Sequence, residues 1–368
     1  MSGEIVLRVF LFLLGLAVAL EVVLSAMRTF VLPRSAADPL SRAVFLGMRV
    51  LFNPWTRRAR SYEERDRAMA LFAPVSLLLL PIVWLALVLT GYMAMFWALG
   101  VRPLRAAFTV SGSSLLTLGF AAVDNLPRTA LAFSEAAVGL ILVALLIAYL
   151  PTMYTAFSRR ENAVTMLEVR AGSPPSALEM LLRYHRLKRL DKLGDLWVTW
   201  EVWFADVEET HTSLAALAFF RSPQPDHSWV TAAGAVLDAA SLVSATLDVA
   251  NDPQVDLCIR AGYLALRRIA DFFRVPYNPA PSADDPISVT RFEFDEVYDR
   301  LAAAGLPLKP DRDQAWRDFC GWRVNYDAVL LALAALTMAP EAPWSSDRSL
   351  SGLRRSKITG VPLRTPDS

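Results

Sequence analysis

The stretch VRPLRAAFTVSGSSLLTLGFAAVDNLPRT, residues 101–129, decides the fold that this sequence predicts. It joins two long apolar segments, at 69–100 and 130–157, where a plain connector would be polar. The stretch is instead largely apolar, yet it is too short to cross a membrane as a helix of ~20 residues and leave room for turns. Because Pro103 suits the first position of a helix, we expect a short helix over 104–116 that enters the membrane and stops. The chain then returns to the side from which it came, which makes a re-entrant loop.

Three apolar segments are long enough to span a membrane, at 5–32, 69–100 and 130–157. Hydrophobic residues make up 54% of the 368 residues and charged residues 20%, and the mean hydropathy is +0.36. This excess is concentrated in the three segments, whereas the C-terminal half has the composition of a soluble helical protein. The first segment is too long for a secretory signal and lacks its basic start. We therefore expect a retained transmembrane helix at 1–33 and an outer helix, loop and inner helix at 68–157.

The basic residues predict how these spans are oriented. The Arg-rich connector at 34–67 holds eight arginines against four acidic residues, and three more arginines follow the third span. By the positive-inside rule, the connector and the C-terminal half are cytoplasmic and the N-terminus is outside. Only four of the 37 basic residues are lysine, a skew typical of GC-rich bacterial genomes. The expected location is therefore a bacterial inner (plasma) membrane, which the chain crosses several times.

The segment after the predicted short helix reads Thr117-Leu118-Gly119-Phe120-Ala121. Here the sequence resembles the filter of the two-transmembrane pore-loop potassium channel family, which reads Thr-Val/Ile-Gly-Tyr/Phe-Gly between an outer and an inner helix. The first four positions match in register, whereas Ala121 stands in the place of the family's last glycine. The resemblance implies that these five residues bind ions in a homotetramer. The Thr117 hydroxyl and the backbone carbonyls then replace the hydration shell of potassium or another monovalent cation.

The same resemblance implies roles for two residues of the third span. Gly139 and Pro151 lie close to the places where inner helices of such channels carry a glycine hinge and a proline bend. We therefore predict that they form a gating hinge. Glycine and proline are also frequent in membrane helices in general, so simple helix packing is the alternative.

Glu21 is an ionisable residue within the first apolar segment, which by default makes it a functional hypothesis. It lies seven residues before Arg28, on the same helical face, so a structural ion pair is the favoured interpretation. The first segment has no arginine at every third position, as a voltage sensor would have. We expect it to be a peripheral helix.

The residues from 158 onward predict an all-helical cytoplasmic domain in which helix-period stretches alternate with turn signals. We divide it into a first part at 158–275, a second part at 276–339 and a disordered tail at 340–368. Thr290 and Glu293 have the spacing of a capping box at the start of one helix. The expected helices cover 159–170, 176–190, 191–212, 229–248, 254–273, 290–304 and 314–337.

Few side chains in this half are candidates for chemistry. Glu208, Glu209 and His211 crowd one predicted helix end and could hold a metal ion, but a solvated polar surface is the favoured interpretation. The two cysteines, Cys258 and Cys320, lie in apolar helical sequence and are expected to be reduced and buried.

An aromatic stripe recurs at helical spacing in the same region and comprises Trp197, Trp200, Trp203 and Phe204. We expect this stripe to pack in the core of the domain rather than to cage a ligand. No catalytic constellation and no phosphate-binding glycine fingerprint stands out. The sequence therefore predicts no enzymatic activity, no cofactor and no resident metal.

The predicted fold class is an all-α membrane protein, with a transmembrane helix, an outer helix–pore loop–inner helix unit and an all-helical cytoplasmic domain. The resemblance implies a passive, homotetrameric cation channel with a cytoplasmic regulatory domain whose ligand is unknown. The alternative is a non-conducting, membrane-anchored helical sensor or scaffold derived from a channel, which Ala121 could reflect. The formal net charge of +1 argues against a nucleic-acid partner. The expected partners are monovalent cations, membrane lipid and identical subunits.

Overall fold

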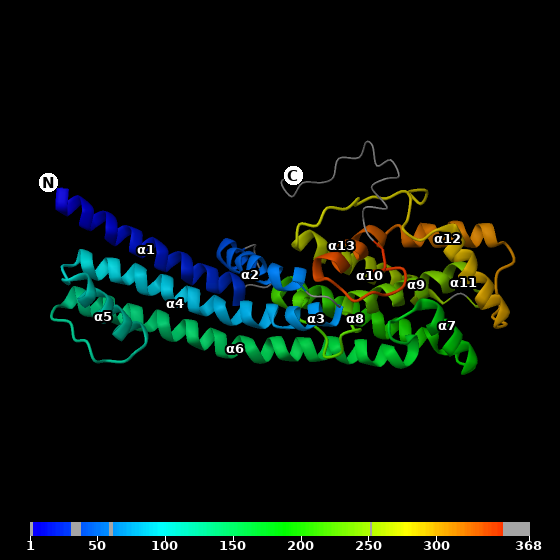
Figure 1. Cartoon of the computed structure of the whole chain (residues 1–368), viewed down its shortest axis with the longest axis horizontal. Helices are drawn as coiled ribbons and strands as arrows, with labels where there is room; N and C mark the ends of the chain where they lie inside the picture. Colours follow the sequence, from blue (N-terminus) through cyan, green and yellow to red (C-terminus); the bar gives the residue numbers. More distant parts are fainter. Residues whose placement is uncertain (1–2, 31–37, 59–61, 251, 349–368) are drawn as a thin grey trace. The chain divides into compact units, whose positions relative to one another are not determined.

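The computed structural model describes residues 3–30, 38–58, 62–250 and 252–348 of the chain (Figure 1). These residues form helices and turns, and among them there is no β-strand beyond an isolated bridge between Leu247 and Leu308. The predicted all-α fold class is therefore confirmed.

The chain divides into two compact units. The apolar unit comprises Met1–Arg60 and Ala68–Thr155, and the C-terminal unit comprises Ser61–Arg67 and Ala156–Ser368. Helix α6 (Leu126–Ala171) has its first part in the apolar unit and its last part in the C-terminal unit. The sequence predicts that the third apolar segment continues as a helix to about residue 170, and the structure confirms this continuity.

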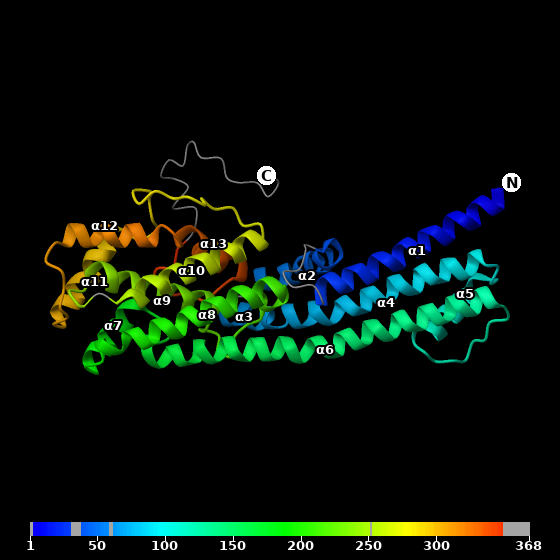
Figure 2. The same cartoon turned by 180° about the vertical axis from the view of Figure 1, so that it is seen from behind.

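The apolar unit contains the three segments predicted to span a membrane. Helix α1 (Gly3–Phe30), helix α4 (Phe72–Ala98) and helix α6 are each long and apolar enough to cross. The short helix α5 (Leu104–Leu115) lies beside the end of α4 and the start of α6, as both views show (Figures 1 and 2). Several helices of this kind are what a membrane protein requires.

Gly15 and Gly91 let α1 and α4 pack closely. A Cβ atom at Gly15 would lie 2.3 Å from the carbonyl oxygen of Gly91, so a larger residue would force the two helices apart. Further along the same pair, Trp84 Nε1 donates a hydrogen bond to Ser25 Oγ at 3.0 Å. This bond provides the partner that a buried indole needs, and it ties α4 to α1.

Glu21 is paired with the residue that the sequence suggests. Arg28 Nη1 lies 3.2 Å from Glu21 Oε1 and 3.9 Å from Asp38 Oδ1. The Glu21 side chain is 53% exposed, so this is a surface ion pair of small energetic weight. The contact supports the structural interpretation of Glu21.

The Arg-rich connector at 34–67 is largely helical rather than an open loop. It contains α2 (Pro39–Arg58) and the first part of α3 (Tyr62–Ala70), while residues 34–37 and 59–61 lie outside the described residues. Within the C-terminal unit, Arg221 Nη1 lies 3.2 Å from Asp66 Oδ1 and donates to the carbonyl of Met338 at 2.8 Å. The start of α3 is thus bound to the C-terminal helices.

The C-terminal unit is built around α9 (Trp229–Thr246). This helix is long and apolar enough to cross a membrane, but 94% of its apolar stretch is buried within the protein, so it is a core helix. One hydrophobic core extends from Val164 to Trp344, across both parts that the sequence predicts. The other helices of the unit are α7 (Ala177–Arg186), α8 (Leu193–Ser213), α10 (Pro253–Phe272), α11 (Arg291–Ala303), α12 (Arg312–Arg323) and α13 (Asp327–Thr337), with short 3-10 turns at Leu190–Lys192 and Ala215–Phe219.

Local sequence signals in this unit are confirmed where they can be checked. Thr290 Oγ1 accepts from Glu293 N at 3.3 Å and Thr290 N donates to Glu293 Oε2 at 2.7 Å, which is the predicted capping box. The predicted aromatic stripe on α8 is buried in the core, and it comprises Trp197, Trp200, Trp203 and Phe204.

The single helix predicted over 314–337 is wrong, because the structure has two helices there with a bend of 52° between them. The bend lies next to a buried polar network. Arg323 Nη1 and Tyr326 OH both donate to Asp238 Oδ1 on α9, and Arg323 Nε donates to Asp327 Oδ1 at 2.7 Å. The bend thus places Arg323 of α12 and Tyr326 of the connecting turn on the same carboxylate of α9.

His211 is fully buried, so the prediction of a solvated polar surface is wrong for this residue. Its Nε2 lies 3.2 Å from Arg160 Nη1, and its ring centroid is 4.5 Å from that of Trp229. Burial and the neighbouring Arg160 hold the pKa of His211 well below its ordinary value, so the ring is neutral at neutral pH. Glu208 pairs instead with Arg268, at 2.7 Å. No group of metal-binding side chains occurs in the part of the chain that the structure describes.

Residues 340–348 belong to the predicted disordered tail, yet the structure places them against the core. The ring centroid of Trp344 lies 5.6 Å from that of Phe319, and the carbonyl of Trp344 accepts from Arg323 Nη2. Ser345 is 1% exposed. The prediction of disorder is therefore wrong for residues 340–348, and the rest of the predicted tail, 349–368, lies outside the described residues.

Candidate functional site

The ends of α4 and α6 frame the candidate site, and the two helices run antiparallel. The carbonyl of Leu99, just after α4, accepts from Arg128 Nη2 in the first turn of α6 at 2.8 Å. Further along the pair, Tyr92 OH lies 3.1 Å from Ser134 Oγ. The two contacts show that α4 and α6 are antiparallel. The chain between them, residues 99–125, therefore starts and ends at the same end of the helix pair.

Helix α5 lies between these two helices and runs parallel to α6. Ser111 Oγ lies 2.5 Å from Glu135 Oε1. One turn later on both helices, a Cβ atom added to Gly139 would lie only 2.2 Å from the carbonyl oxygen of Leu115. The two contacts pair residue 111 with 135 and residue 115 with 139, so α5 and α6 run in the same direction. Since α5 advances about 18 Å over its twelve residues, the loop 116–125 must return over the same distance to reach the start of α6.

The C-terminus of α5 ends in a Schellman motif centred on Thr117. Thr117 N donates to the carbonyl of Ser114 at 3.0 Å, and Leu118 N donates to the carbonyl of Ser113 at 2.8 Å. Thr117 has φ of +53°, a left-handed conformation that glycine or asparagine usually adopts. For a β-branched residue this conformation costs on the order of 1–2 kcal/mol, and strain of this kind is concentrated at functional sites.

The five predicted filter residues follow this cap as non-helical backbone. Gly119 also has a positive φ, of +73°, so the left-handed conformation occurs at two alternate positions. Ala121 is not at positive φ, and its N donates to Ser113 Oγ at 3.2 Å, so its methyl group costs nothing here. Among the described residues, no hydrogen bond reaches the carbonyl oxygens of residues 117–120.

The side chains of this segment are open to their surroundings in the single chain. Leu118 is 58% exposed and Phe120 is 67% exposed, and no atom lies within 4 Å of a Cβ position at Gly119. Large apolar side chains exposed side by side require cover from lipid or another subunit. The structure thus places Thr117 to Phe120 in one exposed segment, with Ala121 half-buried against the core, and ion binding by the five residues stays a prediction.

Glu135 is a further residue of the site that the sequence-based interpretation does not single out. It is fully buried between α5 and α6, and its Oε2 has no hydrogen-bond partner among the described residues. Ser111 Oγ lies 3.0 Å from the carbonyl of Leu89 as well as near Glu135, so one hydroxyl connects all three helices. The signal in the sequence is a carboxylate one turn before Gly139 in an apolar segment.

Gly139 and Pro151 lie on α6, which is helical without a break at both positions. Gly139 faces the end of α5, and its missing side chain is what lets the Leu115 carbonyl approach. Pro151 is exposed, and its carbonyl accepts from Thr155 Oγ1 at 2.8 Å. Packing therefore accounts for Gly139, and a hinge at these two residues stays a prediction.

Replacing Gly139 with leucine is expected to separate α5 from α6 and to destabilise the protein by on the order of 3 kcal/mol, because the contact leaves no room for a side chain. The measurement is thermal unfolding of the purified chain in detergent. The matched control is Gly112→Ala on α5, where a Cβ would meet Leu89 Cδ1 at an ordinary 3.7 Å. Equal stability of the two variants would contradict the contact.

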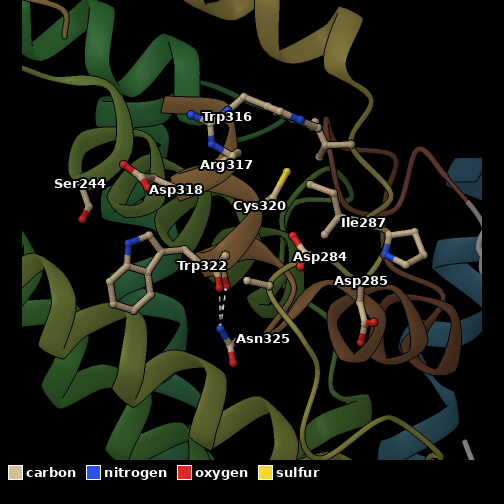
Figure 3. A pocket seen from close by; sticks show the side chains of 14 residues that line it. Ser244, Asp284, Asp285, Ile287, Trp316, Arg317, Asp318, Cys320, Trp322 and Asn325 are labelled. Carbon is tan, nitrogen blue, oxygen red and sulfur yellow. Dashed lines mark hydrogen bonds between the residues drawn. The ribbon is translucent and has the colours of Figure 1, made fainter. Parts of the chain in front are cut away.

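A separate hollow of about 840 Å³ lies in the C-terminal unit, between α12 and the linker before α11 (Figure 3). Trp316 and Trp322 of α12 and Ile287 of the linker line it with apolar groups. Asp284 and Asp318 also line it. The C-terminal unit therefore offers a hollow of ligand size, lined by groups of mixed character.

No family model, curated protein or solved structure matches this chain.

Proposed function

We propose that the chain is the subunit of a passive cation channel of the potassium-channel type, with residues 117–121 as the selectivity filter. The observation that carries the proposal is the row of four carbonyls, at residues 117–120, that accept no hydrogen bond among the described residues. They follow a short helix that runs parallel to α6 inside the apolar unit. Ions would move down their electrochemical gradient through the pore.

Carbonyl oxygens without hydrogen bonds are unfavourable inside a membrane unless another group or an ion binds them. Non-helical backbone at membrane depth is tolerated only when it is buried in protein or lines a water-filled path. A dehydrated cation supplies the missing partner, because rings of carbonyl oxygens can replace its hydration shell. Positive φ at Thr117 and Gly119 supports this use, since reversing the backbone at alternate residues turns neighbouring carbonyls toward one side. The negative end of the α5 dipole adds attraction for a cation.

A single filter segment cannot surround an ion, so the proposal requires several copies of the chain. The exposed Leu118 and Phe120 side chains are the surfaces that neighbouring subunits would cover. Mass measurement of the purified protein in detergent or nanodiscs is expected to give four subunits, in keeping with closed cyclic symmetry. A stable monomer or dimer would exclude this pore.

The direct test of function is potassium flux. The purified protein in liposomes, with a potassium gradient and a fluorescent flux readout, is expected to dissipate the gradient without any added energy source. Empty liposomes and liposomes with heat-denatured protein are the controls. A protein that is tetrameric yet passes no ion would contradict conduction.

The alternative is a non-conducting, membrane-anchored sensor or scaffold derived from a channel. Two features of the segment support this alternative. Ala121 stands in the place of the family's last filter glycine, and the Thr117 backbone caps α5. The flux experiment separates the two functions, because only the channel dissipates the gradient.

A further inference from the structure

We propose that α2 binds the surface of a bilayer that contains anionic phospholipids, with its exposed apolar face among the headgroups and its arginines on the lipid phosphates. α2 does not belong to the helices that are apolar enough to cross a membrane. It nevertheless lies in the apolar unit, between α1 and α4, and both of these helices are apolar enough to cross a membrane. This binding is independent of ion conduction and extends beyond the proposed function.

The start of α2 is fastened to the last turns of α1. Ser25 Oγ donates to Asp38 Oδ2 at 2.7 Å, and the same oxygen accepts from Ser41 N at 2.7 Å, which caps α2. Thr29 Oγ1 also lies 2.9 Å from Ser41 Oγ. α2 therefore begins at the level where α1 ends.

One face of α2 packs on the first turn of α4. The ring centroid of Phe52 lies 5.7 Å from that of Phe72, and the centroid of Phe45 lies 6.3 Å from it. Phe52 and Met48 are each 6% exposed. Because the end of α1 and the start of α4 both contact α2, this helix lies at the boundary of the apolar unit and not along its length.

Outside its packed face, α2 exposes large apolar side chains. Leu46 and Val50, one turn apart and opposite the packed face, are 51% and 68% exposed. Leu51 and Trp55, again one turn apart, are 66% and 60% exposed and lie on the flank, where the Trp55 ring centroid is 5.5 Å from that of Phe52. Single exposed apolar residues are ordinary, but four large ones within about three turns of one helix mark a binding surface. Tryptophan is enriched at the headgroup level of membranes, and the exposed Trp55 suits such an interface.

The charges of α2 point to a lipid rather than to a protein partner. Its sequence from Pro39 to Arg58 contains arginines and no acidic residue. Arg42, Arg49 and Arg58 are exposed and form no ion pair within the part of the chain that the structure describes. A surface that offers hydrocarbon and phosphate together matches an apolar face bordered by arginine, and amphipathic helices of this composition lie in the interface of anionic membranes.

The first test measures the depth of residue 50. A full-length chain with Cys258→Ala, Cys320→Ala and Val50→Cys is labelled with an environment-sensitive fluorophore. It is then placed in nanodiscs of phosphatidylcholine with or without phosphatidylglycerol. We expect blue-shifted emission, quenched by spin-labelled lipid, at position 50. We expect neither effect with the label at Ser282→Cys, an exposed site of the C-terminal unit.

The second test removes the charges. Replacing Arg42, Arg49 and Arg58 together with glutamine is expected to lower the affinity for phosphatidylglycerol about tenfold and to leave that for phosphatidylcholine unchanged. Native mass spectrometry during lipid titration measures both affinities. The matched control carries glutamine at three exposed arginines of the C-terminal unit and keeps the wild-type lipid preference. These arginines are Arg189, Arg260 and Arg300.

Three outcomes overturn the proposal. Water-like emission at position 50 in phosphatidylglycerol nanodiscs shows that the apolar face does not enter the bilayer. Shielding at position 50 that persists in detergent and resists spin-labelled lipid shows that a second copy of the chain covers the face. An unchanged preference for phosphatidylglycerol in the triple variant shows that the arginines do not bind lipid phosphate. None of these readouts depends on ion flux, so failure of the channel proposal leaves the test intact.

Discussion

Replacing Gly119 with aspartate is expected to abolish potassium flux in liposomes while the number of subunits stays the same. Gly119 has φ of +73°, where a residue with a Cβ atom costs about 1–2 kcal/mol. No heavy atom lies within 4 Å of that Cβ position in the single chain, so the variant strains the backbone without a clash inside the subunit. Relief of the strain rotates the peptide groups on either side, which turns the carbonyls of the proposed filter away from a common line.

Gly100→Asp is the matched control for this variant. Gly100 also has a positive φ, of +88°, and it lies in the apolar unit but outside the proposed filter. The control introduces the same residue at a second glycine of positive φ. A Cβ atom there would lie 3.1 Å from Arg128 Nη2, the far end of a flexible side chain, so we expect the variant to retain flux. Wild-type flux through Gly119→Asp would show that ions pass elsewhere, and the scaffold function would then be preferred.

Replacing Arg323 with methionine is expected to lower the free energy of unfolding of the C-terminal unit by about 3–5 kcal/mol, because it leaves buried carboxylates without their counter-charge. Arg323 is 0% exposed, and its guanidinium donates to Asp238, to Asp327 and to the carbonyl of Trp344. The network joins α9, α12, α13 and the segment after α13. Thermal unfolding followed by tryptophan fluorescence should show a midpoint lower by about 10 °C.

Two further variants make this result specific. Arg317→Met changes the same side chain on the same helix, but Arg317 is exposed and its hydrogen bonds go to Gln314, so we expect a change of less than about 0.5 kcal/mol. Adding Asp238→Asn to Arg323→Met should recover part of the loss, since it removes one of the unpaired charges. A midpoint for Arg323→Met equal to that of Arg317→Met would contradict the role of the network.

Features that depend on residues close together in the chain could be predicted from the sequence. The capping box at Thr290 and Glu293 involves neighbours three residues apart, and the long apolar runs of α1, α4 and α6 make helices whatever they pack against. The short helix α5 likewise follows from a proline at its start and an apolar stretch too short to cross. In each case the energy comes from local hydrogen bonds and from the hydrophobicity of one segment.

Features that depend on contacts between distant segments could not be predicted in this way. The bend after Arg323 and the burial of His211 and Trp344 depend on partners on other helices or loops, namely Asp238, Arg160 and Phe319. A helical period in α12 and α13 carries no information about a carboxylate on α9. A polar residue at a helix end is exposed by default, and only a buried partner reverses that expectation.

The candidate site combines both kinds of information. The sequence by itself determined the motif at 117–121, its place between two apolar segments and the resemblance that it carries. Only the tertiary structure decided that α5 runs parallel to α6, through Ser111 on Glu135 and Leu115 on Gly139, and that Thr117 caps α5 with a left-handed backbone. The physical reason is that composition governs which segments leave water, whereas close packing and the pairing of buried polar groups govern how those segments meet.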